Sequence, residues 1–144
     1  MCCYNLAAKN FDMDNKAIVT RFNKQFIEGG DINVFNEIVD DTVINHTAPE
    51  GIAKDKNGML EVIGFFRKAF PNLIVEIYEQ VAEGDVVATR KAFRGKHMGA
   101  FMGIEPTGKE IIILVMDFVR LRNGKYVEHW GMRDIQYIMK QLNG

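Results

Sequence analysis

The chain is 144 residues long, 47% of them hydrophobic and 26% charged, and it carries a formal net charge of −1. This size suits one domain with a single core, and the composition is ordinary for a soluble globular protein. The basic residues are dispersed among acidic ones, so the chain lacks the positive surface that nucleic acids and anionic membranes attract. We therefore expect no nucleic-acid partner and no membrane partner.

The N-terminal residues 1–12 are predicted to form a flexible tail, and residues 13–144 a single domain. The tail lacks the charged and apolar regions of a signal peptide, and no apolar run in the chain approaches the thickness of a bilayer. The two cysteines, Cys2 and Cys3, are adjacent and have no third cysteine with which to pair. A reducing compartment is the simplest interpretation, so we expect a cytoplasmic protein.

Three helices are predicted to open the domain. Asp14 suits the cap of the first helix, in which Ile18, Phe22 and Phe26 recur at a spacing of four on one stripe. Gly29-Gly30 ends this helix, as glycine commonly does at a C-terminal cap. The predicted elements of this half are helices at residues 14–28, 31–38 and 57–70, with a short strand at residues 42–46.

From residue 73 onward the hydrophobic period changes to two, which indicates β-strands. Asn123-Gly124 between two such runs is a strong hairpin signal, because both residues tolerate the positive φ of a tight turn. The strand Glu110–Arg122 is longer than most strands, so we expect it to bend. The predicted elements of this half are strands at residues 73–82, 86–95, 110–122 and 126–130, and a helix at residues 135–142.

Helices followed by consecutive strands with short turns predict an α+β fold built on an antiparallel sheet. A long curved sheet with helices laid across one face forms a cone. The mouth of such a cone is a natural site for a pocket, so a small hydrophobic molecule is the partner that we expect.

Asp117 breaks the apolar pattern of the longest strand. Strict alternation places it on a face that is otherwise formed by Ile111, Ile113, Val115, Val119 and Leu121. An unpaired carboxylate on that face would be costly, so Asp117 should be paired, hydrogen-bonded or protonated. Two interpretations stay open: a structural ion pair or a bulge that turns it to solvent, and a pocket carboxylate with a raised pKa.

Arg90 is a similar exception on the neighbouring strand. It shares its predicted face with Val86, Ala88 and Ala92. If the intervening hairpin closes symmetrically about Gly103 and Ile104, Arg90 lies opposite Asp117 and can pair with it. A bulge would shift this register, and a solvated arginine on an edge strand is the alternative.

The three histidines lie far apart and form no metal-binding pattern, and the chain has no nucleotide or cofactor fingerprint. His46 is the strongest imidazole candidate, because it ends a short strand just before a proline-containing loop. His129 is predicted to face opposite to its neighbours Glu128 and Trp130. Asp134 suits a helix cap first, although its carboxylate could also lie at the rim of a pocket.

Several short stretches together resemble one known family. They are Asn45–Gly51, Gly95–Gly99, Pro106–Gly108, the turn Asn123-Gly124-Lys125, and Glu128-His129-Trp130 with Asp134. In order and spacing they resemble the SnoaL-like polyketide cyclases, a branch of the nuclear transport factor 2-like superfamily. The resemblance implies a cone-shaped, cystatin-like α+β fold, with a curved mixed sheet, three N-terminal helices packed on it and an interior pocket.

The resemblance also implies a homodimer and a cofactor-free reaction, an aldol ring closure of a polyketide ester in which an Asp is the general acid and base. The chain departs from that pattern, because the catalytic Asp of the cyclases aligns with Gly131. Asp134 lies three residues later, where the cyclases have a different acidic residue. The cyclase mechanism therefore cannot be transferred residue by residue.

Two hypotheses for function follow. The first is an enzyme that performs cofactor-free acid–base chemistry on a carbonyl or polyketide-like hydrophobic substrate, of cyclase or isomerase type. The second is a non-catalytic ligand-binding or dimerisation module of the same fold, which Gly131 favours. Neither hypothesis requires a metal or a cofactor. The catalytic candidates are Asp117, His46, Asp134 and His129, and the candidate substrate contacts are Arg90, Asn45, Trp130, Phe118 and Met116.

Overall fold

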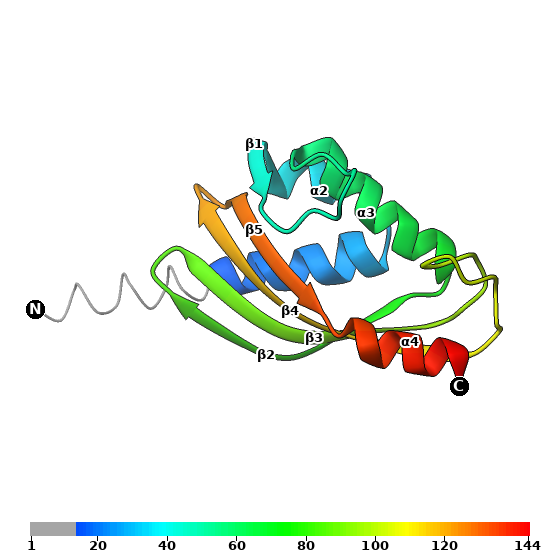
Figure 1. The fold of residues 1–144 in the computed structure, drawn as a ribbon. Helices are drawn as coiled ribbons and strands as arrows, with labels where there is room; N and C mark the ends of the chain where they lie inside the picture. The colour runs from blue at the N-terminus through cyan, green and yellow to red at the C-terminus, as the bar shows by residue number, and fades with distance from the viewer. Residues whose placement is uncertain (1–13) are drawn as a thin grey trace, which may run out of the picture.

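A curved five-stranded sheet carries the fold (Figure 1). The computed structural model describes residues 14–144; the expected tail, with Cys2 and Cys3, lies outside the described residues. Residues 14–21 are α-helical and continue into a π-helix. The elements that follow are η1 (Phe22–Glu28), α2 (Ile32–Ile38), β1 (Val39–Asn45), α3 (Lys56–Ala69), β2 (Ile74–Glu83), β3 (Val86–Lys96), β4 (Glu110–Arg122), β5 (Lys125–Arg133) and α4 (Ile135–Asn143).

The strand order is β1-β5-β4-β3-β2. The pairs β2–β3, β3–β4 and β4–β5 are antiparallel, and β1 pairs with β5 in parallel. The helical segment 14–28, α2 and α3 lie on one side of the sheet, and α4 follows β5 at the far end (Figure 1). The expected α+β fold, with a curved mixed sheet and three N-terminal helices, is therefore confirmed, with α4 as a fourth helix.

Local signals in the sequence determine most of the element ends. Asp31, Asp55 and Asp134 each cap a helix, and their carboxylates accept backbone N–H bonds from Asn33, Gly58 and Tyr137 at 3.0, 2.9 and 3.0 Å. Asn123 and Gly124 have φ values of +53° and +74°, as a primed hairpin turn requires. The predicted hairpin is therefore confirmed.

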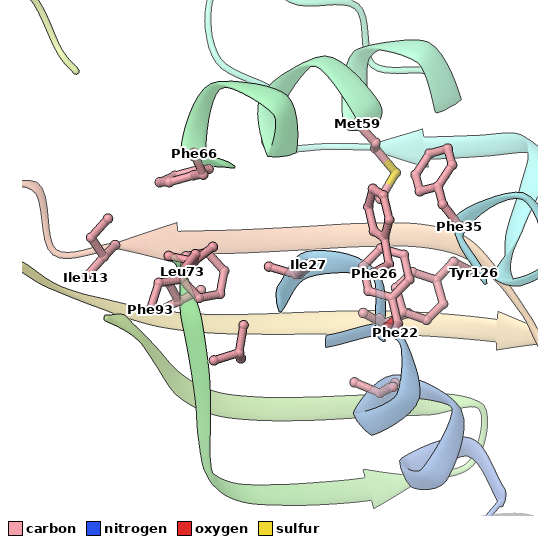
Figure 2. Close-up of a cluster of buried hydrophobic side chains, with 14 of the residues drawn as sticks. Phe22, Phe26, Ile27, Phe35, Met59, Phe66, Leu73, Phe93, Ile113 and Tyr126 are labelled. Atoms are coloured by element: carbon pink, nitrogen blue, oxygen red, sulfur yellow. The ribbon is translucent and has the colours of Figure 1, made fainter. Parts of the chain in front are cut away.

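The core lies between the helices and one face of the sheet. Aromatic side chains pack between helix and strand and between helices: the ring centroids of Phe22 and Tyr126 are 4.5 Å apart, and those of Phe26 and Phe35 are 4.7 Å apart (Figure 2). The inward residues of β4, including Ile111 and Ile113, are almost fully buried. The opposite face of the sheet exposes apolar side chains, which include Met116, Phe118 and Met132.

The loop between β3 and β4 is organised around the buried His97. Its Nδ1 accepts a hydrogen bond from the backbone N–H of Thr107 at 3.1 Å and lies 3.0 Å from the Thr107 hydroxyl. The His97 backbone also bonds to Lys109 and Gly108. The stretches Gly95–Gly99 and Pro106–Gly108 are thus joined by hydrogen bonds that hold the loop together. No helix among the described residues is both long and apolar enough to cross a bilayer.

Candidate active site

A cavity lies between the helices and the concave face of the sheet. The cavity is small, with a volume of about 80 Å³, and it is partly open to solvent, so it lies below the usual size range of small-molecule sites. Most of the wall is apolar and comes from η1, α2, α3 and the sheet. The polar or charged lining residues are Asn45, Thr47, Lys91, Asp117, Tyr126, His129 and Arg133.

A buried ion pair lies in the wall of this cavity. The Lys91 Nζ is 2.9 Å from Asp117 Oδ2, and their side chains are only 2% and 7% exposed. Lys91 also donates a hydrogen bond of 2.6 Å to the side-chain oxygen of Asn23, which extends from η1. The inward position predicted for Asp117 is confirmed, and the ion-pair interpretation was right about its surroundings.

The partner predicted for Asp117 was wrong. Asp117 pairs in register with Thr89, and Arg90 pairs with Met116. The pairing of β3 with β4 is shifted by one residue from the symmetric arrangement. Such a shift moves the side chains that would pair to opposite faces of the sheet. Arg90 therefore lies on the outer face, where it forms an exposed ion pair with Glu79 at 2.7 Å.

The charge of Asp117 is set by opposing effects. Burial alone raises the pKa of Asp117, but the Lys91 ammonium and the nearby His129 ring outweigh it and hold the pKa at about 2. The expectation of a raised pKa was therefore wrong, and the carboxylate is ionised at neutral pH. Its second oxygen, Oδ1, is buried and accepts no hydrogen bond within residues 14–144.

His129 joins this pair from β5. Its Nδ1 is 2.9 Å from the side-chain oxygen of Asn45, and its Nε2 is 3.5 Å from Asp117 Oδ2. Asn45 is aligned with His129 in the parallel pairing of β1 with β5. Thr47, just after β1, accepts a hydrogen bond of 2.8 Å from the backbone N–H of Gly131. The structure therefore brings together three of the predicted residues, Asp117, His129 and Asn45.

His46 does not line the cavity, so its predicted direction toward the pocket was wrong. Its Nε2 is 2.8 Å from Glu128 Oε2, and its ring stacks on Trp130 with centroids 4.6 Å apart. Glu128 also pairs with Arg120 at 3.1 Å. The prediction that His129 faces away from Glu128 and Trp130 agrees with these contacts.

The remaining predicted contacts also lie outside the interior cavity. Arg90, Met116, Phe118 and Trp130 line a larger, open groove of about 620 Å³ on the outer face of the sheet, and so does Asp134, whose carboxylate caps α4. Met116 and Phe118 are 63% and 53% exposed. The structure thus divides the predicted site into an interior group and an outer group.

Four polar or charged cavity residues were missed from the sequence: Thr47, Lys91, Tyr126 and Arg133. Burial, and then the charge of Asp117, raise the pKa of Tyr126, so this hydroxyl remains a protonated donor. For Lys91 a signal existed, because alternation places it on the same face as the buried Val87 and Phe93. A lysine on the buried face of β3 is as unusual as an aspartate on the buried face of β4.

Gly131 faces Asp117 across the β4–β5 pairing. A Cβ atom built on Gly131 would lie 2.9 Å from Cε1 and 3.3 Å from Nε2 of His129, and 3.7 Å from the Cβ of Asp117. The His129 ring thus fills the space that a side chain at position 131 would need. An acidic group is present beside this position, but it comes from β4.

Within residues 14–144, no three His, Cys, Asp or Glu side chains lie close enough together to hold a metal ion. The interior site instead combines an anion, a cation, an imidazole and a phenol in a largely apolar wall. Such a set can accept a proton, stabilise the resulting cation and donate hydrogen bonds to an oxyanion.

Comparisons with known proteins agree with this architecture. The model of the SnoaL-like polyketide cyclase family matches residues 17–142. Among solved structures, the chain is similar to IdmH from Streptomyces antibioticus at 29% identity, with a TM-score of 0.80 over 90% of this chain and 99% of that one. It is also similar to AclR from Streptomyces galilaeus at 25% identity, with a TM-score of 0.81 over 92% and 97% of the two chains.

A third similar structure comes from Bacillus cereus ATCC 10987, at 26% identity and a TM-score of 0.78 over 90% of this chain and 80% of that one. IdmH and the Bacillus protein are described as putative polyketide cyclases, and AclR as a putative hydroxylase. No curated protein matches the chain significantly. The curved sheet and its helices form the nuclear transport factor 2-like fold, and the chain belongs to the SnoaL-like polyketide cyclase family.

Proposed function

We propose that this protein is an enzyme that performs cofactor-free proton transfer on a small hydrophobic carbonyl compound, in a reaction of cyclase or isomerase type. The observation that supports this proposal best is the placement of His129. Its ring lies in a largely apolar cavity, with Asn45 Oδ1 2.9 Å from one nitrogen and Asp117 Oδ2 3.5 Å from the other.

In the proposed reaction His129 is the base. A hydrogen bond from Nδ1–H to Asn45 leaves the lone pair on Nε2, which can remove a proton from the carbon next to the carbonyl group. The imidazolium that forms is then stabilised by the carboxylate of Asp117. Lys91 keeps that carboxylate ionised, and Tyr126 can donate a hydrogen bond to the developing enolate oxygen.

This proposal assigns the proton transfer differently from the family pattern. Gly131 has no side chain to act as the acid and base, and Asp117, with a pKa of about 2, is too weak a base to work alone near neutral pH. The pair of His129 and Asp117 would share the task. The non-catalytic ligand-binding module remains the second candidate, and it is favoured by the same glycine.

A hydrogen–deuterium exchange assay tests the proposal. The purified protein should accelerate exchange at the carbon between the two carbonyl groups of a hydrophobic β-keto ester in D₂O. His129→Gln should lower the enzymatic rate by about 10²- to 10⁴-fold, because general-base catalysis contributes on that order. The rate can be followed by proton NMR under single-turnover and multiple-turnover conditions.

His46→Gln is the matched control, because His46 is the histidine that pairs with Glu128 outside the cavity. It should keep the parental rate, and both variants should keep the parental melting temperature. If the parent shows no exchange above the buffer rate across a broad panel of hydrophobic carbonyl compounds, esters and carboxylic acids alike, while hydrophobic ligands still raise its melting temperature, the binding module is the correct function.

We further propose that the protein is a homodimer in the cytoplasm and that the outer face of the sheet forms the dimer interface. Support comes from the apolar side chains exposed there, which include Met116, Phe118 and Met132 at 63%, 53% and 76%. A contiguous apolar patch of this kind is unusual on the surface of a monomer. The symmetric partner of such a patch in a two-fold dimer is the same patch on a second copy.

Phe118→Glu should therefore convert the dimer into a monomer, because it places a charge in an apolar interface. Sedimentation velocity at micromolar concentration measures the change. Met98→Glu is the control, since Met98 is 53% exposed but belongs to the β3–β4 loop. A parent that sediments as a monomer would contradict this part of the proposal.

A further inference from the structure

Arg133, at the end of β5, is a half-buried cation without a counter-charge. Burial lowers the pKa of Arg133, and no acidic group among the described residues lies close enough to oppose that effect. Its guanidinium lies 5.0 Å from the centroid of the Phe66 ring. The electron-rich face of a ring offsets only part of the solvation that a buried guanidinium loses.

The other half-buried arginines of the described chain all have oxygen partners. They are Arg21 with Glu37 at 2.7 Å, Arg67 with the backbone oxygens of Ile27 and Glu28 at 2.7 Å, Arg94 with Glu76 at 2.7 Å, and Arg120 with Asp85 at 2.6 Å. Arg133 is the exception. Its donors therefore remain available to a group that is not part of the protein.

The position of Arg133 shows where such a group would lie. Arg133 lines the interior cavity, the outer groove and a third, apolar cavity formed by α3, residues 100–102 and α4. It is the one described residue that lines all three. A ligand whose apolar body fills the interior cavity would therefore place its polar end at this junction.

We propose that Arg133 binds the carboxylate of the ligand, so that the protein selects hydrophobic carboxylic acids over their neutral esters. The planar guanidinium donates two parallel N–H bonds, which match the two oxygens of a carboxylate. An anion at this position would supply the counter-charge that the protein lacks. The inference depends on the proposed use of the interior cavity, but it does not depend on proton transfer.

Matched pairs of an acid and its methyl ester test the inference. 2-Naphthoate and 4-phenylbutanoate, each with its own methyl ester, can be titrated into the full-length protein by calorimetry and by thermal shift. The parent should bind each acid about 10- to 100-fold more tightly than its ester, as charge-assisted hydrogen bonds imply. Arg133→Gln should remove this preference, and Arg133→Lys should retain only part of it.

Arg122→Gln is the matched control, because Arg122 is an exposed arginine at the β4–β5 turn and lines none of the three cavities. It should keep the preference for the acid. Arg133→Gln should also keep or raise the melting temperature, since it removes a cation without a partner. If that variant does not fold, Arg133→Lys decides the question, because a lysine at this position keeps the charge but loses the two parallel N–H donors and should weaken the preference.

Equal affinity of the parent for acid and ester would overturn the inference, as would binding of neither compound at millimolar concentration. A preference for the acid that survives in Arg133→Gln would also overturn it. These outcomes are distinct from failure of the proposed function. Acid-selective binding without deuterium exchange would refute proton transfer alone, and exchange without acid selectivity would refute the role of Arg133 alone.

Discussion

Replacing Asp117 with Asn should lower the free energy of unfolding by about 3–5 kcal/mol, because it leaves the Lys91 ammonium buried without a counter-charge. The lysine side chain is 2% exposed, so water cannot replace the lost partner. Urea unfolding followed by circular dichroism measures the loss. Lys91→Met should be similarly costly, because it leaves the carboxylate uncompensated.

The double variant Asp117→Asn with Lys91→Met should lose much less stability than the sum of the single variants, since it removes both charges together. Arg90→Met is the control: it removes a cation from the neighbouring position of β3, but from an exposed ion pair with Glu79. Its effect should stay within about 0.5 kcal/mol. Additive losses for Asp117 and Lys91 would show that the two groups are not coupled.

The same carboxylate should make stability depend on pH in acid. In the folded protein the pKa of Asp117 is about 2, below the ordinary value of 3.8. Between those values the unfolded chain binds a proton that the folded chain does not, so the stabilisation is complete above about pH 5 and is lost as the pH falls through about 2. Asp117→Asn should lack this part of the acid dependence, which urea unfolding at pH 2 to 5 can measure.

Gly131→Ala should reduce the exchange rate by roughly 10²-fold or more, although it removes no functional group. The new Cβ would lie 2.9 Å from Cε1 of His129, so the ring must move away from Asn45 and Asp117. The φ of Gly131 is not positive, so alanine is compatible with the backbone. The expected effect therefore comes from the contact between the new Cβ and the His129 ring. Stability should fall by about 1–3 kcal/mol, as overpacking usually costs.

Gly64→Ala supplies the matched control, because a Cβ at this position of α3 would meet no atom within 4 Å. It should keep the parental rate and raise stability by about 0.5–1 kcal/mol, since alanine favours a helix more than glycine does. A Gly131→Ala variant that keeps the parental exchange rate would show that the base is not His129, or that its position tolerates displacement.

Features encoded by neighbouring residues were predictable from the sequence. The Asn123-Gly124 turn, the helix caps at Asp31 and Asp134 and the inward direction of Asp117 all depend on local backbone preference or on alternation within one strand. The limits of β4 were also predicted correctly, because its pattern has no irregularity. The fold class follows from the order of such elements.

Features that depend on pairing between distant strands were not predictable. The partner of Asp117 depends on the register of β3 with β4, and the long loop between them contains Met102 and Gly103 with positive φ. The direction of His46 depends on the pairing of β1 with β5, whose register shifts between Val39 and Ile44. No local pattern determines where a bulge of that kind occurs.

The π-helix η1 has a consequence for the polar site. Its hydrogen bonds span five residues, so successive residues are separated by a smaller angle about the helix axis than in an α-helix. Two adjacent residues can therefore both face the core. Adjacent residues are therefore buried in pairs, Phe22 with Asn23 and Phe26 with Ile27. Phe22 thus packs in the core against Tyr126, and the side-chain oxygen of the adjacent Asn23 accepts a hydrogen bond from Lys91. The π-helical winding therefore couples hydrophobic packing to the electrostatics of the cavity, so a change in this winding would alter both.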